Sequence, residues 1–259
     1  KSNKVLIWPN TSNAFIEIHT GNWSRPTSLF VTSDNIFYVD NGKHSSITVI
    51  ASNQTHAISL INVTKPCHGL FVDILNNLYC SVTYHHLLVK KKLNNHTNAS
   101  EIIATGGNTS SLPTILNRPR GIFVDQYINI YVADSGHHRV IRLDSTLHNF
   151  TIVAGGQHTK ETIGLNEPSG VVLDADGYLY IVDERNERIV GSGPYGFRCL
   201  VGCSSTNGSA SDQLRRPWTM YFDSKGNMYV TDVMNRRIQK FLIATNSCGK
   251  LLLAVKRNK

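Results

Sequence analysis

Short apolar runs separated by polar turns recur along most of the chain. The clearest copy begins at Arg118 and reads RPRGIFVDQYINIYVADSGHHRVIRL. Each apolar run is brief and bounded by turn residues, a pattern that predicts β-strands. The first strand is expected to open at Pro119, where a missing N–H costs little. The three strands are expected at residues 122–124, 130–132 and 140–143, with a chain reversal at 125–128.

Four further copies align with this one, and each is led by a proline. The prolines are spaced 40, 53, 49 and 49 residues apart: Pro26, Pro66, Pro119, Pro168 and Pro217. A fourth apolar run follows the third strand of each copy. Repeats of this length, built from four short strands, are typical of propeller blades. The sequence therefore predicts an all-β fold, a β-propeller of four-stranded antiparallel blades.

Residues 1–24 match only the second half of this repeat. The apolar runs 4–8 and 14–18 correspond to third and fourth strands, so they are expected to form half a blade. Five full blades and one half blade are thus expected, with residues 1–259 forming a single propeller domain. Two closures of the ring stay open: a sixth blade completed by residues beyond Lys259, or an irregular closure.

The repeats resemble NHL repeats, most clearly in the third, fourth and fifth copies. Those copies keep the proline, an aspartate after the first strand, Tyr-Val-x-Asp or Tyr-Ile-Val-Asp, and Arg-Ile or Arg-Val. The resemblance covers nearly the whole chain. It implies a six-bladed propeller of the NHL family, and the features described next favour an extracellular member.

An aspartate and an arginine stand five residues apart in three copies. The pairs are Asp134/Arg139, Asp183/Arg188 and Asp232/Arg237. The second copy has Val82 and Leu87 in their places. Loss of both partners together is expected of a structural ion pair, because one partner alone would be a stranded charge. Contact with a ligand is the alternative role.

Five cysteines suggest two disulfides. Cys67 and Cys80 fall close to facing positions on the first two strands of the second copy, and Cys199 and Cys203 flank a Val-Gly turn. Both spacings suit a bridge, so we predict a disulfide in each pair. Cys248 is left without a predicted partner.

Nine Asn-x-Ser/Thr sequons occur, against about four expected by chance if positions were independent. All lie near the connection of third and fourth strands or the return to the next copy, where a glycan is solvated. The preference of Asn, Ser and Thr for loops is the alternative explanation. With the cysteine pairs, the sequons predict an extracellular or secretory location, and no apolar run suits a membrane span. The asparagines are Asn10, Asn22, Asn53, Asn62, Asn95, Asn98, Asn108, Asn149 and Asn207.

Signatures of catalysis are scarce. A related propeller, the peptidyl-hydroxyglycine amidating lyase, holds zinc through histidines near the channel, whereas the corresponding strand openings here offer only His68. No Gly-x-Ser-x-Gly elbow, P-loop or Cys-x-x-Cys pair is found. We therefore predict no metal, no cofactor and no catalytic residues. A propeller lyase or hydrolase with a divergent site remains an alternative.

The net charge of +8 favours an acidic partner. Bases precede most repeat prolines, and the symmetry of a propeller would gather them at one axial mouth. Arg120 and Trp218 directly follow their prolines with no partner fixed by the repeat, and Arg with Trp is typical of interface hot spots. Pairing of each pre-proline arginine with an aspartate of the adjoining blade is the alternative. The predicted binding residues are Arg25, Lys65, His68, Arg118, Arg120, Arg216 and Trp218.

Two binding functions are compatible with these features. The first is a secreted or cell-surface interaction module that binds a protein, peptide or glycan with an anionic group. The second is an intracellular NHL-type propeller that binds RNA through a basic face. The sequons and cysteine pairs favour the first.

Overall fold

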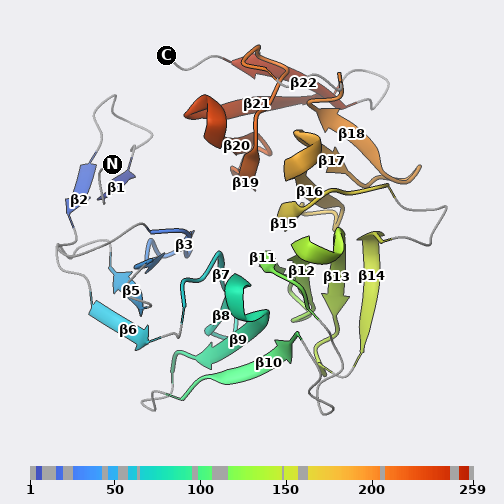
Figure 1. Ribbon diagram of the computed structural model, residues 1–259. Helices are drawn as coiled ribbons and strands as arrows, with labels where there is room; N and C mark the ends of the chain where they lie inside the picture. Colours follow the sequence, from blue (N-terminus) through green and yellow to red (C-terminus); the bar gives the residue numbers. More distant parts are fainter. Residues whose placement is uncertain are drawn as a thin grey trace.

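The computed structural model describes residues 4–7, 16–19, 26–42, 46–51, 58–62, 65–94, 99–106, 116–147, 149–156, 163–204, 208–245 and 251–256. Within them, five four-stranded antiparallel sheets stand around a central axis (Figure 1). The predicted β-propeller of four-stranded blades is therefore confirmed. No helix in these ranges is long and apolar enough to cross a bilayer.

Each blade is a meander of four consecutive strands that runs from the axis outward (Figure 1). The first two blades comprise β3 (Leu29–Val31), β4 (Phe37–Asp40), β5 (Ser46–Ile50) and β6 (Ile58–Asn62), then β7 (Gly69–Val72), β8 (Asn77–Val82), β9 (Leu87–Lys92) and β10 (Glu101–Thr105). The third and fourth comprise β11 (Pro119–Val124), β12 (Ile130–Asp134), β13 (Arg139–Leu143) and β14 (Phe150–Gly155), then β15 (Pro168–Leu173), β16 (Leu179–Asp183), β17 (Arg188–Gly191) and β18 (Arg198–Val201). The fifth comprises β19 (Pro217–Phe222), β20 (Met228–Asp232), β21 (Arg237–Thr245) and β22 (Leu251–Lys256).

The N-terminal segment forms a two-stranded sheet of β1 (Lys4–Ile7) and β2 (Ile16–His19), which pair antiparallel. Figure 1 shows this sheet between the first and fifth blades. Val5 is buried in a cluster with residues of β4 and β5, including Phe37 and Val39. The half blade expected from the sequence is thus present as two strands.

A recurring aspartate closes the turn between the first two strands of a blade. In the second blade, Asp73 accepts the backbone N–H groups of Leu75 at 2.9 Å and Asn77 at 2.8 Å. The hydroxyl of Tyr79 donates to its other oxygen at 2.8 Å. The same Tyr-to-Asp bond recurs in the fourth and fifth blades. This turn chemistry explains why the repeat carries Asp after its first strand and Tyr in its second.

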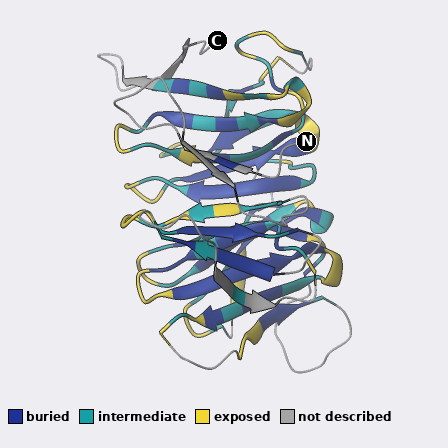
Figure 2. Ribbon diagram, turned by 90° about the vertical axis from the view of Figure 1, so that its left-hand side faces the viewer, coloured by how far each residue is buried: buried dark blue, intermediate teal, exposed yellow. Residues whose placement is uncertain are grey.

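Apolar side chains fill the space between neighbouring blades. One cluster joins Tyr79, Leu88 and Ile103 of the second blade to Ile122 and Val132 of the third. Figure 2 shows buried residues along the strands and exposed residues at the turns. The hydrophobic contacts between blades are thus the main stabilising element of the ring.

One end of the propeller carries the repeat prolines, and we call it the proline face. Pro119 pairs with Asp134, so each first strand starts beside the end of the second strand. The short 3-10 turns that follow the second strands lie at this face too. They are η1 (Thr83–His85), η2 (Ser135–His137), η3 (Glu184–Asn186) and η4 (Val233–Asn235).

The three Asp/Arg pairs share one geometry at this face. Arginine Nε lies 2.8 Å from aspartate Oδ2 in Asp134/Arg139, Asp183/Arg188 and Asp232/Arg237. Each aspartate is fully buried. Its Oδ1 accepts the backbone N–H two residues before the proline of its blade, at 2.7 Å, from Asn117, Asn166 or Arg215. The pair therefore ties the segment entering a blade to the end of its second strand.

The second blade, which lacks this pair, has a disulfide between Cys67 and Cys80, with Cα atoms 5.4 Å apart. Cys67 lies just before β7, and its N–H donates to the buried Asp40 of the first blade at 3.0 Å. A second disulfide joins Cys199 to Cys203. Both predicted disulfides are confirmed, while Cys248 lies outside the described residues.

Candidate ligand-binding site on the propeller axis

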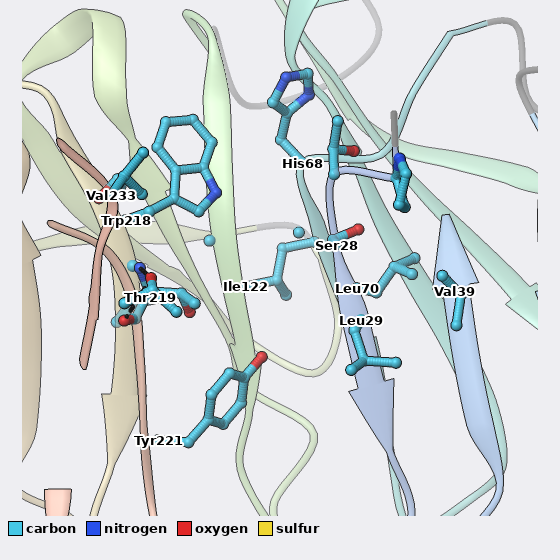
Figure 3. A pocket seen from close by; sticks show the side chains of 18 of the residues that line it. Ser28, Leu29, Val39, His68, Leu70, Ile122, Trp218, Thr219, Tyr221 and Val233 are labelled. Atoms are coloured by element: carbon cyan, nitrogen blue, oxygen red, sulfur yellow. Dashed lines mark hydrogen bonds between the residues drawn. The ribbon is translucent and has the colours of Figure 1, made fainter. Parts of the chain in front are cut away.

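A cavity of about 590 Å³ lies on the propeller axis. Its wall is formed by residues at the innermost strands of all five blades, together with Val39 of β4, Thr231 of β20, Val233 of η4 and Val5 of the N-terminal sheet. Figure 3 shows Trp218 and His68 at one end of this cavity, and Tyr221 and Leu29 farther along it. The volume falls within the range of known small-molecule sites, which is roughly 300–1,000 Å³.

The first strands approach one another closely around this cavity because small residues stand at their start. A Cβ atom on Gly121 would lie 2.8 Å from the Cα atom of Gly170 in the next blade. Such a distance is not tolerated between these atoms, so glycine is needed where the strands of the third and fourth blades meet. Ser28 and Thr219 line the cavity near the start of the other first strands.

The cavity wall is mainly apolar. Leu29, Val39, Leu70, Ile122 and Val171 contribute aliphatic side chains. The hydroxyl groups in the wall are engaged by the protein itself: Ser28 donates to the Cys67 carbonyl at 2.7 Å, Ser169 to that of Pro217 at 3.2 Å and Thr231 to that of Thr219 at 3.2 Å. These hydroxyls therefore support contacts within and between blades and offer few free donors to the cavity.

Aromatic side chains from opposite sides of the ring meet at the proline face. The rings of His68 and Trp218 have centroids 6.2 Å apart, although one lies in the second blade and the other in the fifth. Tyr84 of η1 packs edge-on against His68 with centroids 5.4 Å apart, and its side chain is 65% exposed. The mouth of the cavity is thus framed by aromatic rings.

The imidazole of His68 is neutral at physiological pH. Burial lowers its pKa below the ordinary value, and the charges of Arg120 and Arg118 lower it further, while a hydrogen bond with the Pro66 backbone and the charge of Asp40 act in the opposite direction. Its Nδ1 atom is buried and forms no hydrogen bond with any described residue. This nitrogen is therefore not open to a ligand, although other atoms of His68 line the cavity.

Arg120 is held in a buried network of charges. Its guanidinium bonds to Glu184 and, at 3.2 Å, to Glu167, both from the fourth blade. Glu184 is 1% exposed and also binds Arg216 of the fifth blade at 2.7 Å. The carbon atom of the Arg120 guanidinium lies 4.9 Å from the centre of the Trp218 ring. The network therefore joins the third, fourth and fifth blades beside the mouth.

Three of the residues that directly precede a repeat proline adopt a left-handed backbone conformation. The φ angles are 51° for Arg118, 46° for Glu167 and 50° for Arg216. This conformation is strained for residues other than glycine, by roughly 1–3 kcal/mol each. A hydrogen bond from the Arg118 N–H to Nδ1 of His86, at 3.0 Å, helps to hold the first of them. The strain occurs at the same face as the cavity mouth.

The predicted binding residues fall into three groups. Trp218 and His68 line the cavity. Lys65 and Arg118 are exposed, and no described carboxylate forms an ion pair with either of them. Arg120 and Arg216 are both paired with Glu184, a residue that the repeat does not specify. Arg25 lies outside the described residues.

Sequence reasoning missed two residues of this region, although both carry a signal. Glu184 directly follows the last second-strand residue, at a position held by Asn, Thr, Ser or Val in the other copies, so its charge is unusual there. Tyr221 is the one polar residue where the other first strands have Phe or Val. The signals are thus a charge at a position that is uncharged in the other copies for Glu184, and a hydroxyl at an otherwise apolar position for Tyr221.

The predicted glycosylation sites are described only in part. Asn149 is exposed just before β14. Asn62 is the last residue of β6. The other seven asparagines lie outside the described residues.

No protein-family model and no curated protein matches the chain. Similar solved structures include a protein of unknown function from Bacteroides thetaiotaomicron, with 15% identity, coverage of 92% of this chain and 63% of that one, and a TM-score of 0.72. An auxiliary nutrient binding protein from the same bacterium has 17% identity and a TM-score of 0.65, and the match covers 87% of this chain and 60% of that one. Inactive virginiamycin B lyase from Staphylococcus aureus, in complex with quinupristin, has 12% identity and a TM-score of 0.62, and the match covers 94% of this chain and 74% of that one.

These identities show similarity of fold alone. The chain spans less than two thirds of the length of the two Bacteroides proteins. The comparisons and the blades together establish a β-propeller fold.

Proposed function

We propose that this chain is an extracellular interaction module of NHL type that binds a ligand at the mouth of the axial cavity. The ligand is a protein, peptide or glycan that carries an anionic group. The observation that carries this proposal is the cavity of about 590 Å³ that has Trp218 and His68 at its end on the proline face. A concave site with a few convergent polar groups is the usual form of a ligand site.

The charges at the proline face favour an anion. Glu167 and Glu184 face three arginines, Arg120, Arg185 and Arg216, so the network itself retains a positive charge. Arg118 adds a further charge close enough to influence both His68 and Glu167. Lys65 is exposed directly before Pro66. An acidic group at the mouth would therefore be attracted and oriented by the rim.

Two disulfides support an extracellular location, because thiols stay reduced in the cytosol. The exposed sequon at Asn149 is compatible with this location. The similar Bacteroides protein is named as a nutrient-binding protein, and a binding role for this chain would agree with that name. RNA binding in the cytosol is disfavoured by the same disulfides.

A binding screen tests the proposal. The 259-residue chain is measured against arrays of acidic glycans, acidic peptides and secreted proteins. Trp218→Ala and Arg118→Ala are expected to weaken the binding of any ligand found, while Tyr127→Ala and Arg198→Ala serve as matched controls, since both residues are exposed away from the cavity. A ligand bound equally well by all four variants would place the site on another surface.

A further inference from the structure

The geometry points to an amphipathic ligand whose apolar part enters the axial cavity while its anionic group stays at the rim beside Arg118 and Lys65. This assignment of a ligand class rests on the proposed function, since both concern the same site. The rim and the cavity differ in chemistry: the rim carries positive charge, whereas the cavity wall is aliphatic and aromatic. A ligand that satisfies both has one charged end and one apolar end.

Apolar side chains are left uncovered inside the cavity. Leu29 is 38% exposed, Tyr221 47% and Val233 50%, and all three line it. Leu29 and Tyr221 belong to first strands and Val233 to η4, so three elements contribute apolar side chains to the cavity wall. Exposed apolar surface gathered in a concave site indicates an apolar occupant.

The same wall is poorly suited to a sugar. A sugar ring presents many hydroxyls, which need protein donors and acceptors to replace water. The hydroxyls of Ser28, Ser169 and Thr231 already donate to backbone carbonyls. The hydroxyl of Thr27 likewise donates within the protein. An apolar group gives up no hydrogen bonds with water when it enters such a cavity, so the wall favours it over a glycan.

Tyr221 supplies one polar group within the apolar wall. Although this side chain is partly exposed in the cavity, the surrounding protein atoms desolvate its phenol and raise its pKa above the ordinary value, with a smaller opposing effect from a hydrogen bond with Thr219. The phenol therefore keeps its proton at neutral pH. Figure 3 shows its hydroxyl directed into the cavity. It can donate to an acceptor on the apolar part of the ligand, which would fix the depth of insertion.

The entrance matches this polarity. The rings of Trp218 and His68 flank it, and aromatic faces accept apolar groups readily. Beyond them, Arg118 lies near enough to act on the charge state of His68. The apolar part enters beside these rings while the anion meets the bases. Two sources supply such chemistry: a free apolar carboxylic acid, or a peptide terminus that ends in an apolar residue.

Two fluorescent probes test the ligand class. Anilinonaphthalene sulfonate is an apolar anion, and phenylnaphthylamine has the same rings without the sulfonate. The anion is expected to bind with increased, blue-shifted emission and at least about tenfold more tightly than the neutral probe. Arg118→Ala is expected to remove most of that difference. Equal affinity for the two probes would overturn the assignment of an anionic ligand.

A matched pair of substitutions locates the site. Leu29→Trp fills the cavity and is expected to weaken binding of the anionic probe by at least about tenfold. Val31→Trp makes the same change two residues along β3, at a side chain 41% exposed that does not line the cavity, and is expected to leave binding unchanged. Thermal denaturation checks that both variants fold. If Leu29→Trp does not fold, Leu29→Glu replaces it, because it puts a charge rather than bulk into the wall.

The outcomes separate this inference from the proposed function. If Leu29→Trp and Leu29→Glu bind the probe as the parent does, while Trp218→Ala and Arg118→Ala weaken binding, the mouth is the site and the cavity is not. If none of these variants changes binding, both proposals fail. Displacement of the probe by decanoate identifies a free acid as the source, and displacement by a peptide with a free C-terminal phenylalanine identifies a peptide terminus. Displacement by neither overturns the ligand class.

Discussion

Arg120 and Trp218, from the third and fifth blades, stack across the proline face with the guanidinium carbon 4.9 Å from the ring centre. The arginine is 5% exposed, and Glu184 and Glu167 hold it in place. A cation over an indole face is attracted by the ring quadrupole, more strongly when water is excluded. Arg120 is therefore better described as a residue that positions Trp218 than as a direct contact for a ligand.

Replacing Arg120 by alanine should destabilise the propeller. Glu184 would lose one of its two arginines in a position that is 1% exposed, and an unbalanced buried charge is costly. Because Arg216 still binds Glu184, we expect a loss of about 2 to 4 kcal/mol in the free energy of unfolding. Chemical denaturation with guanidinium chloride measures it.

Arg185→Ala is the control for this prediction. Arg185 binds Glu167 at 3.5 Å, but its side chain is 47% exposed. An exposed ion pair contributes little, so the loss should stay below about 1 kcal/mol. Equal effects of the two substitutions would show that burial of the network does not matter.

Arg188→Ala tests the role of the Asp/Arg pairs. Asp183 is fully buried and would keep only its bonds with Asn186 and the Asn166 backbone. The free energy of unfolding should fall by about 1.5 to 3 kcal/mol because a buried carboxylate loses a charged donor. An unchanged melting temperature together with lost ligand binding would instead make the pair part of a site.

Double substitution Cys67→Ala and Cys80→Ala removes the bond that ties the second blade where the Asp/Arg pair is missing. The closed loop is short, so the expected loss of stability is about 3 kcal/mol, plus the cost of two emptied positions. Peptide mapping without reduction should recover the two cysteines linked in the parent. Free thiols at both positions in protein that was never reduced would contradict the assignment.

The repeat period allowed the blades to be predicted because the same interactions within a blade recur from one blade to the next. The turn aspartate, the second-strand tyrosine and the Asp/Arg pair each bind within one blade, so their spacing is visible in the sequence. The first two blades depart from this pattern, since β3 and β7 begin at Leu29 and Gly69 rather than at the proline. In the second blade, the additional residue between Pro66 and Gly69 shifts the start.

The site could be predicted only in part because it depends on contacts between blades. His68 and Trp218 are 150 residues apart in the sequence but have ring centroids separated by 6.2 Å. The symmetry of a propeller predicted their convergence. It did not predict that Glu184 would neutralise Arg120 and Arg216, because no repeat position specifies a partner in the neighbouring blade. The apolar wall was likewise hidden, since it is assembled from the first strands of five blades.

Occupied glycans would test the extracellular location. Asn149 is exposed next to β14, so a glycan there needs no change in packing. Mass spectrometry of protein secreted from a eukaryotic host should find a glycan on the peptide that contains Asn149, and Asn149→Gln should remove it. Unmodified asparagine at all nine sequons in the native protein would contradict secretion.

His68 should make the stability of the propeller depend on pH. Burial lowers the pKa of its imidazole in the folded state, whereas the unfolded chain keeps the ordinary value of about 6.5. Above that pH the imidazole is neutral in both the folded and the unfolded state, and its full contribution to the stability of the fold is present. As the pH falls below it, the unfolded chain takes up a proton that the folded protein does not, so stability declines toward the lower folded pKa. Melting temperatures between pH 7.5 and 5 should therefore fall more steeply for the parent than for His68→Gln, and parallel curves would show that His68 is not desolvated at the mouth of the cavity.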